Sequence, residues 1–513
     1  MHSSPANVQT IPSSLPHKQT LFAMLRQGIK RCARLRATRS IMTLTKKDLN
    51  PAVVNAQYAV RGKLAVRADE IKEQMRTNPS LFPFDKVINA NIGNPQQLDQ
   101  KPVTFYRQVL AMLQYPELME NAAAVGIPAD AVKRAKKLLD DIGSVGAYSS
   151  SQGVSVVRES VANFIEKRDG FPAQASDIYL TTGASNAVTF LLTTLARGDG
   201  SDGFMIPIPQ YPLYTATLTL QNSNPVPYYL DEAQEWGTNM AALNEAVHST
   251  QHKLKAVVVI NPGNPTGACL GVQEIKDILL LAQKEGIAVI ADEVYQANIF
   301  ASGQFHSFKK VWAMLKQENP DFNVPLASLH STSKGKIGEC GQRGGYMELV
   351  GFHDDVVEQI FKLCSISLCP VVTGQALIEC MVNPPVQGDE SYPLFDKETN
   401  HIMDTLTQRA NRLYEAFKEM PRVSCEPPQG AMYLFPSIEL PAGAIAEAER
   451  HNEKPDEFYC MKLLEQTGIC VIPGSGFGQK DGTYHFRTTF LAPGDDYGEK
   501  IVNFHKKFLA QYE

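Results

Sequence analysis

Short apolar runs alternate with helical patterns from Asp177 to Val350, and this alternation restricts the fold more than any other feature of the chain. Strand-like runs separated by helical segments are typical of a parallel sheet with crossover helices. The runs at Ala256 and Ala288 are apolar throughout, as expected of strands covered on both faces. The sequence therefore predicts an α/β fold with a large domain built on a mostly parallel sheet. The expected strands are Ile178–Leu180, Phe204–Ile206, Val226–Leu230, Ala256–Ile260, Ala288–Ala291, Leu326–His330 and Tyr346–Val350.

Apolar residues at helical spacing predict crossover helices between these strands. The two clearest sets are Val188, Leu191, Leu192, Leu195 and Ile275, Ile278, Leu279, Ala282. After Pro370 the pattern changes to longer helices, Thr399–Met420 and Asp456–Gln466, with strands near Met432–Phe435 and His485–Phe490. This change predicts a second, smaller α+β domain. Segment 382–395 is rich in proline and is predicted as a loop.

The composition, 43% hydrophobic and 20% charged residues, is that of a globular protein. A net charge of −5 without a basic stripe argues against a nucleic-acid partner. No apolar run reaches the roughly 18 to 20 residues that cross a bilayer, so no membrane partner is expected. Nine scattered cysteines without a zinc-ligand pattern indicate a reducing compartment, no structural disulfides and no metal site.

The first 47 residues carry nine lysines and arginines, and no acidic residue precedes Asp48. Apolar residues from Leu21 to Ile29 can form one face of a helix. This composition predicts a mitochondrial presequence and a matrix location, and a disordered basic tail is the alternative. Translation from Met42 would give a cytosolic form.

A lysine, Lys334, follows an expected strand in Leu329-His-Ser-Thr-Ser-Lys-Gly, and Arg343 lies nine positions further on. An imine-forming lysine needs a nearby cation and partial burial to become nucleophilic near neutral pH. Arg343 supplies that cation and also suits a phosphate. Lys336 is a rival amine two residues away.

Other strand ends carry polar residues that suit a ligand. Thr181-Thr-Gly-Ala-Ser-Asn opens a helix, so the amides of Ala184 and Ser185 can bind a phosphate, unless Thr182 or water caps the helix. Asn264 follows the strand at Ala256 in a turn and can donate to a ring oxygen. Asp292 ends the strand at Ala288 and suits a pyridinium nitrogen, with a helix cap as the alternative.

Three further residues complete the candidate set. Tyr295 is near enough in sequence to Asp292 to reach the ring oxygen. Tyr211 follows a strand and can lie against a flat ring, although an aromatic residue there also suits a core. Arg487 can hold a substrate carboxylate in two places, although an ordinary ion pair also explains it. The glycine-rich run at Gly474 lacks the dinucleotide-binding spacing.

Together these segments resemble the fold-type I aminotransferases, and the alanine aminotransferase branch in particular, from about residue 50 to 513. The motifs that carry the resemblance are Asn91-Ile-Gly-Asn-Pro, Gly146-Ala-Tyr-Ser-Ser-Ser-Gln-Gly, Asn261-Pro-Gly-Asn-Pro-Thr-Gly, Ser331-Thr-Ser-Lys-Gly, Gly338-Glu-Cys-Gly-Gln-Arg-Gly-Gly and Gly474-Ser-Gly-Phe-Gly-Gln. The spacing from Lys334 to Arg343 is longer than in the aspartate branch, so loop geometry cannot be copied from those enzymes.

The resemblance implies pyridoxal 5'-phosphate as cofactor, with Lys334 as the Schiff-base lysine that also shuttles the proton. It implies that Arg487 binds the substrate α-carboxylate, that Gly93 lies beside the substrate, and that Tyr148 reaches the phosphate of a neighbouring subunit in a homodimer. The remaining cofactor contacts it implies are phosphate contacts from Ala184, Ser185, Ser331, Ser333 and Arg343, ring stacking by Tyr211, oxygen contacts from Asn264 and Tyr295, and a nitrogen contact from Asp292.

The implied reaction is reversible amino transfer from L-alanine to 2-oxoglutarate, which gives pyruvate and L-glutamate. No residue is identified for the distal carboxylate of 2-oxoglutarate, so another small amino acid stays open as donor. A lyase on the same fold and a catalytically silent binding relative are the rivals. The expected organisation is a presequence at 1–45, an N-terminal segment at 46–135 that belongs in part to the small domain, a large cofactor-binding domain at 136–370 and a small C-terminal domain at 371–513.

Overall fold

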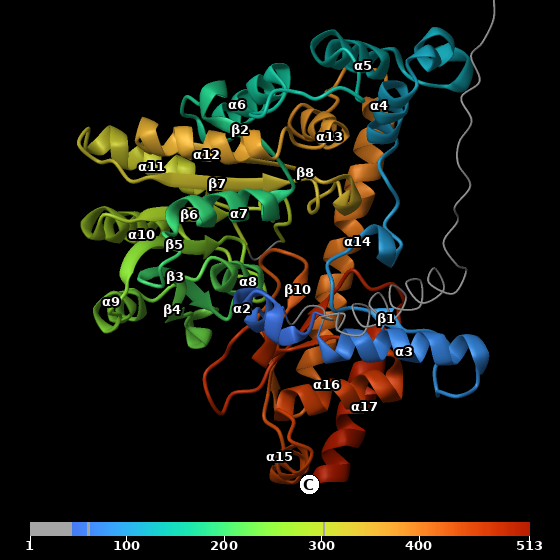
Figure 1. The fold of residues 1–513 in the computed structure, drawn as a ribbon. Coiled ribbons are helices and arrows are strands. Elements are labelled where there is room, and N and C mark those ends of the chain that lie inside the picture. Colours follow the sequence, from blue (N-terminus) through green and yellow to red (C-terminus); the bar gives the residue numbers. More distant parts are fainter. Residues whose placement is uncertain (1–43, 59–61, 301–302) are drawn as a thin grey trace, which may run out of the picture. The chain divides into compact units, whose positions relative to one another are not determined.

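The computed structural model describes residues 44–58, 62–300 and 303–513, and the chain divides into two compact units, Met1–Val54 and Asn55–Glu513 (Figure 1). In the described part of the first unit, Thr45 and Asp48 form a capping box at the short 3-10 helix η1 (Lys46–Asp48). Helix α2 (Pro51–Asn55) follows. The predicted presequence lies outside the described residues except for its last two positions, and Met42 lies outside them too.

A seven-stranded sheet forms the centre of the second unit, in the order β2-β8-β7-β6-β5-β3-β4. All strands are parallel except β8, which is antiparallel to both of its neighbours. The mostly parallel sheet predicted from the sequence is confirmed. The strands are β2 (Ile178–Thr182), β3 (Asp202–Ile208), β4 (Asn224–Tyr229), β5 (Lys253–Ile260), β6 (Ala288–Asp292), β7 (Leu326–Ser331) and β8 (Gly344–Val350).

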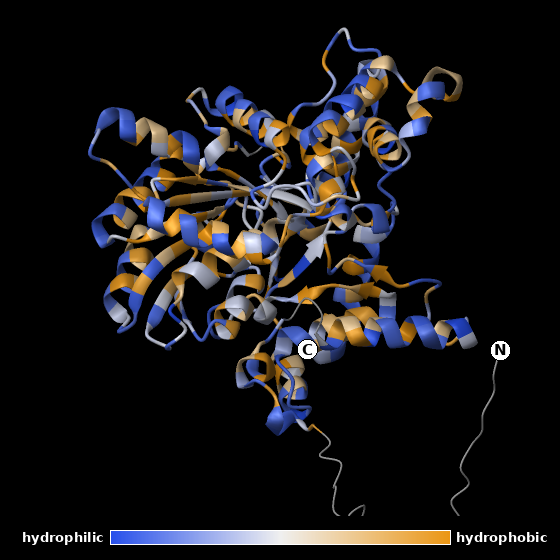
Figure 2. Ribbon diagram, turned by 45° about the horizontal axis from the view of Figure 1, so that its top comes forward, coloured by the Kyte–Doolittle hydropathy of each residue, from blue (hydrophilic) through white to orange (hydrophobic). Residues whose placement is uncertain are grey.

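Helices cover both faces of this sheet, which explains why its central strands are apolar throughout. Along β5, Val258 and Ile260 face one layer of helices, whereas Val257 and Val259 face the other. Burying each such side chain stabilises the fold by roughly 1.5 to 3 kcal/mol. Figure 2 shows hydrophobic residues concentrated along the strands. The first layer contains α7 (Ala184–Leu195), α8 (Leu213–Leu220) and α12 (Asp354–Ile366), and the second contains α9 (Met240–Ser249), α10 (Val272–Glu285) and α11 (Phe308–Glu318).

The C-terminal part contains small sheets and helices, as the sequence predicted. Strand β14 (Phe486–Thr489) pairs with β10 (Tyr433–Leu434) and β13 (Ile472–Pro473). Strand β9 (Val423–Ser424) pairs with β11 (Ser437–Ile438). The helices are α14 (Tyr392–Lys418), α15 (Ala442–Arg450), α16 (Pro455–Thr467) and α17 (Tyr497–Tyr512).

The N-terminal segment, whose partner the sequence left open, packs in two places. Helix α3 (Lys63–Thr77) contacts α16, and β1 (Ile88–Asn89) pairs with β12 (Ile469–Cys470). Helix α4 (Thr104–Gln114) packs against α5 (Ala129–Ile142) and α13 (Val372–Val382), and α13 packs against α6 (Ser155–Asp169). The limits of the large and small domains stay a prediction.

The loop predicted at 382–395 is shorter than expected. Helix α13 continues to Val382, and α14 begins at Tyr392. Pro393 occupies the first turn of α14, where proline is tolerated because its missing N–H would have no partner there. No helix in the described ranges is long and apolar enough to cross a membrane.

Candidate active site

A cavity of about 230 Å³ lies where strands β5, β6 and β7 end. Open α/β sheets bind ligands at the carboxyl ends of their parallel strands, so this is the expected place. The structure brings every predicted site residue except Tyr148 to the wall of this cavity. These residues are Gly93, Ala184, Ser185, Tyr211, Asn264, Asp292, Tyr295, Ser331, Ser333, Lys334, Arg343 and Arg487.

One end of the cavity is suited to an anion. Helix α7 begins at Ala184, and its N-cap Gly183 offers no side chain, so the first N–H groups of the helix remain available. Arg343 donates to the Ser185 hydroxyl over 3.2 Å. Thr182 does not cap this helix, because its hydroxyl instead accepts from the Val371 N–H. A cation and free amides at a helix start attract a phosphate.

Lys334 is the amine that reaches the cavity. Its Nζ donates to the carbonyl of Gly93 over 2.6 Å and lies 5.7 Å from the ring centroid of Tyr295. The rival Lys336 does not line the cavity. The loop that carries Lys334 is held in place because the Gly335 N–H donates to the side-chain oxygen of Asn298 over 2.7 Å.

Asp292, the last residue of β6, is a buried carboxylate. It is 6% exposed, accepts from the Tyr214 hydroxyl over 2.8 Å, and forms no ion pair within the described part of the chain. Burial raises the pKa of this carboxyl group, and the bond from Tyr214, the bond from the Val294 N–H and the positive charge of Lys334 oppose that rise. The alternative of a helix cap is wrong, since the next helix, α11, begins only at Phe308. A protonated ring nitrogen would supply the missing positive charge.

Arg487 on β14 is 1% exposed and faces the same cavity. Its Nη1 donates to Asn264 over 2.8 Å, and its Nη2 donates to the carbonyl of Asn91. Its Nε has no partner among the residues that the structure describes, and no carboxylate there forms an ion pair with it. The ordinary ion pair considered from the sequence is therefore wrong, and the guanidinium is free to take a carboxylate.

The aromatic residues differ in their placement. Tyr211 is half-buried at the cavity wall rather than in a closed core, and its hydroxyl lies 2.5 Å from the hydroxyl of Tyr58. Tyr295 is buried, and its hydroxyl donates to Tyr433 over 3.2 Å. Tyr148 is 77% exposed and lies outside the cavity.

Sequence reasoning missed several residues of this site. Tyr433 and Cys340 line the cavity, and Tyr214 holds Asp292. Tyr214 stands in the same Pro209-Gln-Tyr-Pro-Leu-Tyr segment as Tyr211. Because this segment follows a strand and begins a helix, it could have indicated that both tyrosines lie near the strand ends. For Tyr433 the sequence offers only a short apolar run, with no indication of which side chain faces a ligand.

The fold and this cavity define a class of enzyme: the chain belongs to the class I and II aminotransferases, whose family model, "Aminotransferase class I and II", matches residues 116–498. Members of this class use pyridoxal phosphate. Among individual relatives, the mitochondrial alanine aminotransferase of Saccharomyces cerevisiae is 56% identical over 481 residues, which covers 91% of this chain and 81% of that protein.

Two further matches bear on the activity. A Saccharomyces cerevisiae protein named inactive alanine aminotransferase is 55% identical over 481 residues, which covers 91% of this chain and 95% of that protein. The solved structure of an alanine aminotransferase from Pyrococcus furiosus matches with a TM-score of 0.70 at 25% identity, and the match covers 90% of this chain and 100% of that one.

Proposed function

We propose that this chain transfers the amino group of L-alanine to 2-oxoglutarate, reversibly, to give pyruvate and L-glutamate. The observation that carries the proposal is the convergence of Lys334, Asp292, Arg343 and Arg487 on one cavity. The names of the similar proteins from yeast and Pyrococcus furiosus support alanine as the donor.

The cavity fits pyridoxal phosphate at three separate points. Arg343, Ala184 and Ser185 suit its phosphate, with Ser331 and Ser333 beside them. The unpaired carboxylate of Asp292 suits its ring nitrogen, and Lys334 supplies the amine for covalent attachment. Tyr211 offers a ring face, and Asn264 and Tyr295 offer groups for the ring oxygen. When bound, this cofactor carries the amino group between substrates and withdraws electrons from the substrate α-carbon.

The chain's own residues then have defined tasks. Arg487 binds the α-carboxylate and so orients the substrate, because its guanidinium is already fixed by Asn264. Lys334 removes and returns the proton at the α-carbon from beside Gly93, whose carbonyl holds its nitrogen. The wall of apolar side chains around Ile260 and Val294 limits the water that reaches this proton.

The relative named inactive makes a silent binding protein the second candidate. A product assay separates the candidates: purified protein is incubated with pyridoxal phosphate, ¹⁵N-labelled L-alanine and 2-oxoglutarate. We expect ¹⁵N-glutamate and pyruvate in equal amounts, and none with Lys334→Ala. Pyruvate with ammonia and without glutamate would indicate a lyase, and cofactor binding without any product would indicate a silent relative.

We also propose a homodimer in which Tyr148 reaches the phosphate of the neighbouring subunit. Tyr148 is 77% exposed, and the Ser151 hydroxyl three positions on donates to the carbonyl of Leu368 over 2.6 Å. Leu368 and Ile366 are 53% and 72% exposed. Exposed apolar side chains next to the segment that carries Tyr148 support a subunit interface there.

A mitochondrial matrix location is proposed for the form that starts at Met1, and a cytosolic location for a form that starts at Met42. The basic, acid-free composition of the first 47 residues supports the first, as do yeast and plant relatives named mitochondrial. Sequencing the N-terminus of the protein isolated from mitochondria tests it, since a chain still starting at Met1 there would contradict cleavage.

A further inference from the structure

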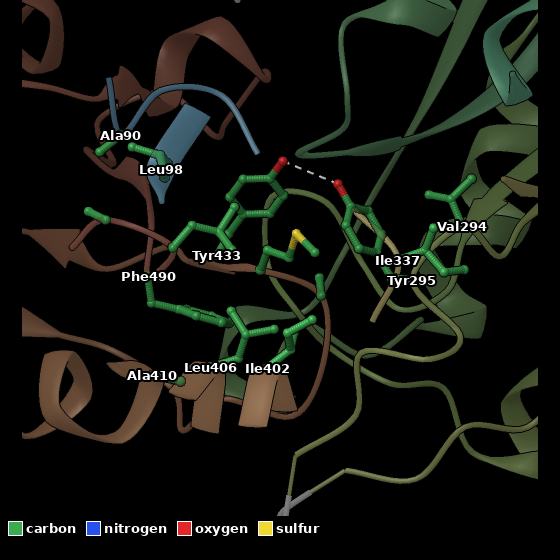
Figure 3. Packing of buried hydrophobic residues seen from close by; sticks show 14 of the residues in the cluster. Ala90, Leu98, Val294, Tyr295, Ile337, Ile402, Leu406, Ala410, Tyr433 and Phe490 are labelled. Atoms are coloured by element: carbon green, nitrogen blue, oxygen red, sulfur yellow. Dashed lines mark hydrogen bonds between the residues drawn. The ribbon is translucent and has the colours of Figure 1, made fainter. Parts of the chain in front are cut away.

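Tyr433 is a buried tyrosine of the cavity wall that the proposed mechanism does not use. It lies on β10, is 3% exposed, and comes from the C-terminal part of the chain. Figure 3 shows its hydroxyl pointing at that of Tyr295, with a hydrogen bond drawn between them. Tyr295 follows β6, so this bond joins the large sheet to the small one.

Three parts of the site meet at Tyr433. The Arg487 guanidinium carbon lies 4.0 Å from the centre of its ring, within the range of a cation–π contact. A Cβ on Gly93 would overlap the Tyr433 hydroxyl and would lie 3.1 Å from the Nζ of Lys334. The hydroxyl therefore occupies the space between the backbone of Gly93, the proposed catalytic lysine and Tyr295.

The charged and titratable groups that face Tyr433 come from several elements: Lys334 from the loop after β7, Arg487 from β14, Tyr295 from the turn after β6, Tyr211 from the turn after β3, and Cys340 from the short helix η7 (Cys340–Gln342).

Burial raises the pKa of the Tyr433 hydroxyl, but Lys334, Arg487 and the bond from Tyr295 outweigh it, and the net shift is downward. Burial raises the pKa of Tyr295. Of the two hydroxyls, Tyr433 therefore loses its proton first, and Tyr295 keeps the proton that it donates.

We propose that Tyr433 is a positioning residue of the active site, an inference that rests on the proposed function. Its hydroxyl fixes the direction of the Tyr295 hydrogen bond, and its ring holds the Arg487 guanidinium. When Tyr433 is neutral, its hydroxyl accepts only weakly from Tyr295, so the Tyr295 proton can also serve the ring oxygen of the cofactor. When Tyr433 is ionised, its negatively charged oxygen accepts the hydrogen bond from Tyr295 more strongly, and the Tyr295 proton is then not available to the cofactor. Activity should therefore fall as the pH rises through the pKa of Tyr433.

The first test needs no cofactor. Tyrosine ionisation is followed by ultraviolet difference absorbance in cofactor-free wild type, Tyr433→Phe and Lys334→Ala. We expect one tyrosine to ionise at lower pH than the rest in wild type, to be missing in Tyr433→Phe, and to move to higher pH in Lys334→Ala. Identical titrations of wild type and Tyr433→Phe would overturn the proposal.

The second test separates positioning from packing in the loaded enzyme. Tyr433→Phe keeps the ring, so KM for L-alanine should stay within about two-fold while kcat falls roughly five-fold, the loss expected for one buried hydrogen bond. The alkaline pH at which the activity of this variant falls should also be higher than in the wild type. Tyr433→Leu lacks the ring face as well, and KM should then rise roughly ten-fold.

The matched control is Tyr459→Phe, because Tyr459 is also fully buried and its hydroxyl lies 3.1 Å from His505, away from the cavity. It should leave the kinetic pH profile unchanged. Equal effects of the Tyr459 and Tyr433 substitutions would refute the positioning role. A wild type without transaminase activity would instead refute the proposed function. The ultraviolet titration of the cofactor-free protein would still test the role of Tyr433.

Discussion

Among single residues, Gly183 leaves the room that Arg343 occupies at the end of the cavity suited to an anion. Its φ of 76° belongs to a region that favours glycine, and a Cβ there would overlap the Nη2 of Arg343. Gly183→Ala should therefore displace Arg343 and weaken pyridoxal phosphate binding roughly 10- to 100-fold, as loss of a charged hydrogen bond predicts. Fluorescence titration of the cofactor-free protein measures this.

The control for this substitution is Gly170→Ala. Gly170 has a φ of 77°, but a Cβ there would meet nothing within 4 Å. The control should lower the melting temperature and leave cofactor affinity unchanged. If both variants weakened cofactor binding equally, backbone strain and not the contact with Arg343 would be the cause.

Residues whose chemistry is tied to a strand end were predictable from the sequence. Lys334, Asp292 and Arg343 stand beside recognisable strands, and the carboxyl ends of parallel strands share one edge of the sheet. Tyr433 was not predictable, because its strand has two residues and its neighbours are set by contacts across more than a hundred residues of chain.

At the element scale, the loop from Lys334 to Arg343 is anchored from outside by α4. Arg107 forms two bonds to Glu339, of 2.8 and 3.0 Å, and Glu339 is 3% exposed. Arg107→Ala leaves a buried carboxylate unpaired, so it should lower the melting temperature by several degrees and weaken cofactor binding. Arg76→Ala removes an exposed ion pair with Glu73 and should change neither quantity measurably. A cofactor affinity unchanged in Arg107→Ala would contradict the anchoring role.

A second element-scale prediction concerns Glu293, which joins β6 to the start of α11 by accepting from the Phe308 N–H over 2.7 Å. Burial raises the pKa of Glu293 to about 8, while Arg168 opposes the rise and Asp169 and Glu348 add to it. The folded protein thus holds this proton up to about pH 8, whereas the unfolded chain releases it near pH 4.5. The contribution of Glu293 to stability is full below pH 4.5 and is lost as the pH rises toward 8.

Glu293→Gln keeps an acceptor for Phe308 and cannot ionise. The melting temperature of the variant relative to wild type should therefore rise by a few degrees from pH 5 to pH 8. Thermal unfolding followed by circular dichroism across this range measures the difference. A difference that does not change with pH would show that Glu293 is ionised in the folded protein at every pH tested.

The elements themselves were predictable to different degrees. All seven strands of the large sheet were predicted, and the central ones carried a continuous apolar signal because helices cover both of their faces, whereas buried and exposed residues alternate in the edge strand β4. Helices α3 to α6 were not assigned from the sequence. Helices α4 and α5 pack against other helices rather than between two strands, and no alternating strand pattern marks their ends.

At the scale of the whole molecule, the proposed dimer predicts shared sites. A subunit with Lys334→Ala and a subunit with Tyr148→Ala are each expected to be weakly active alone. In a mixed dimer, one site carries both substitutions and the other carries neither. Co-expression should therefore restore about half of the wild-type activity per mixed dimer, as the twofold symmetry of a homodimer requires. Activity no greater than the mean of the two parents would contradict a shared site.

We propose that one cavity holds pyridoxal phosphate on Lys334 and accepts L-alanine. The most direct measurement is the absorbance spectrum of the purified, cofactor-loaded protein before and after addition of L-alanine, beside Lys334→Ala. We expect L-alanine to move the long-wavelength band of the bound cofactor to shorter wavelength in the wild type, and Lys334→Ala to lack this change. A wild-type spectrum that alanine leaves unaltered would contradict alanine as the donor, and a wild type that binds no cofactor would contradict the site itself.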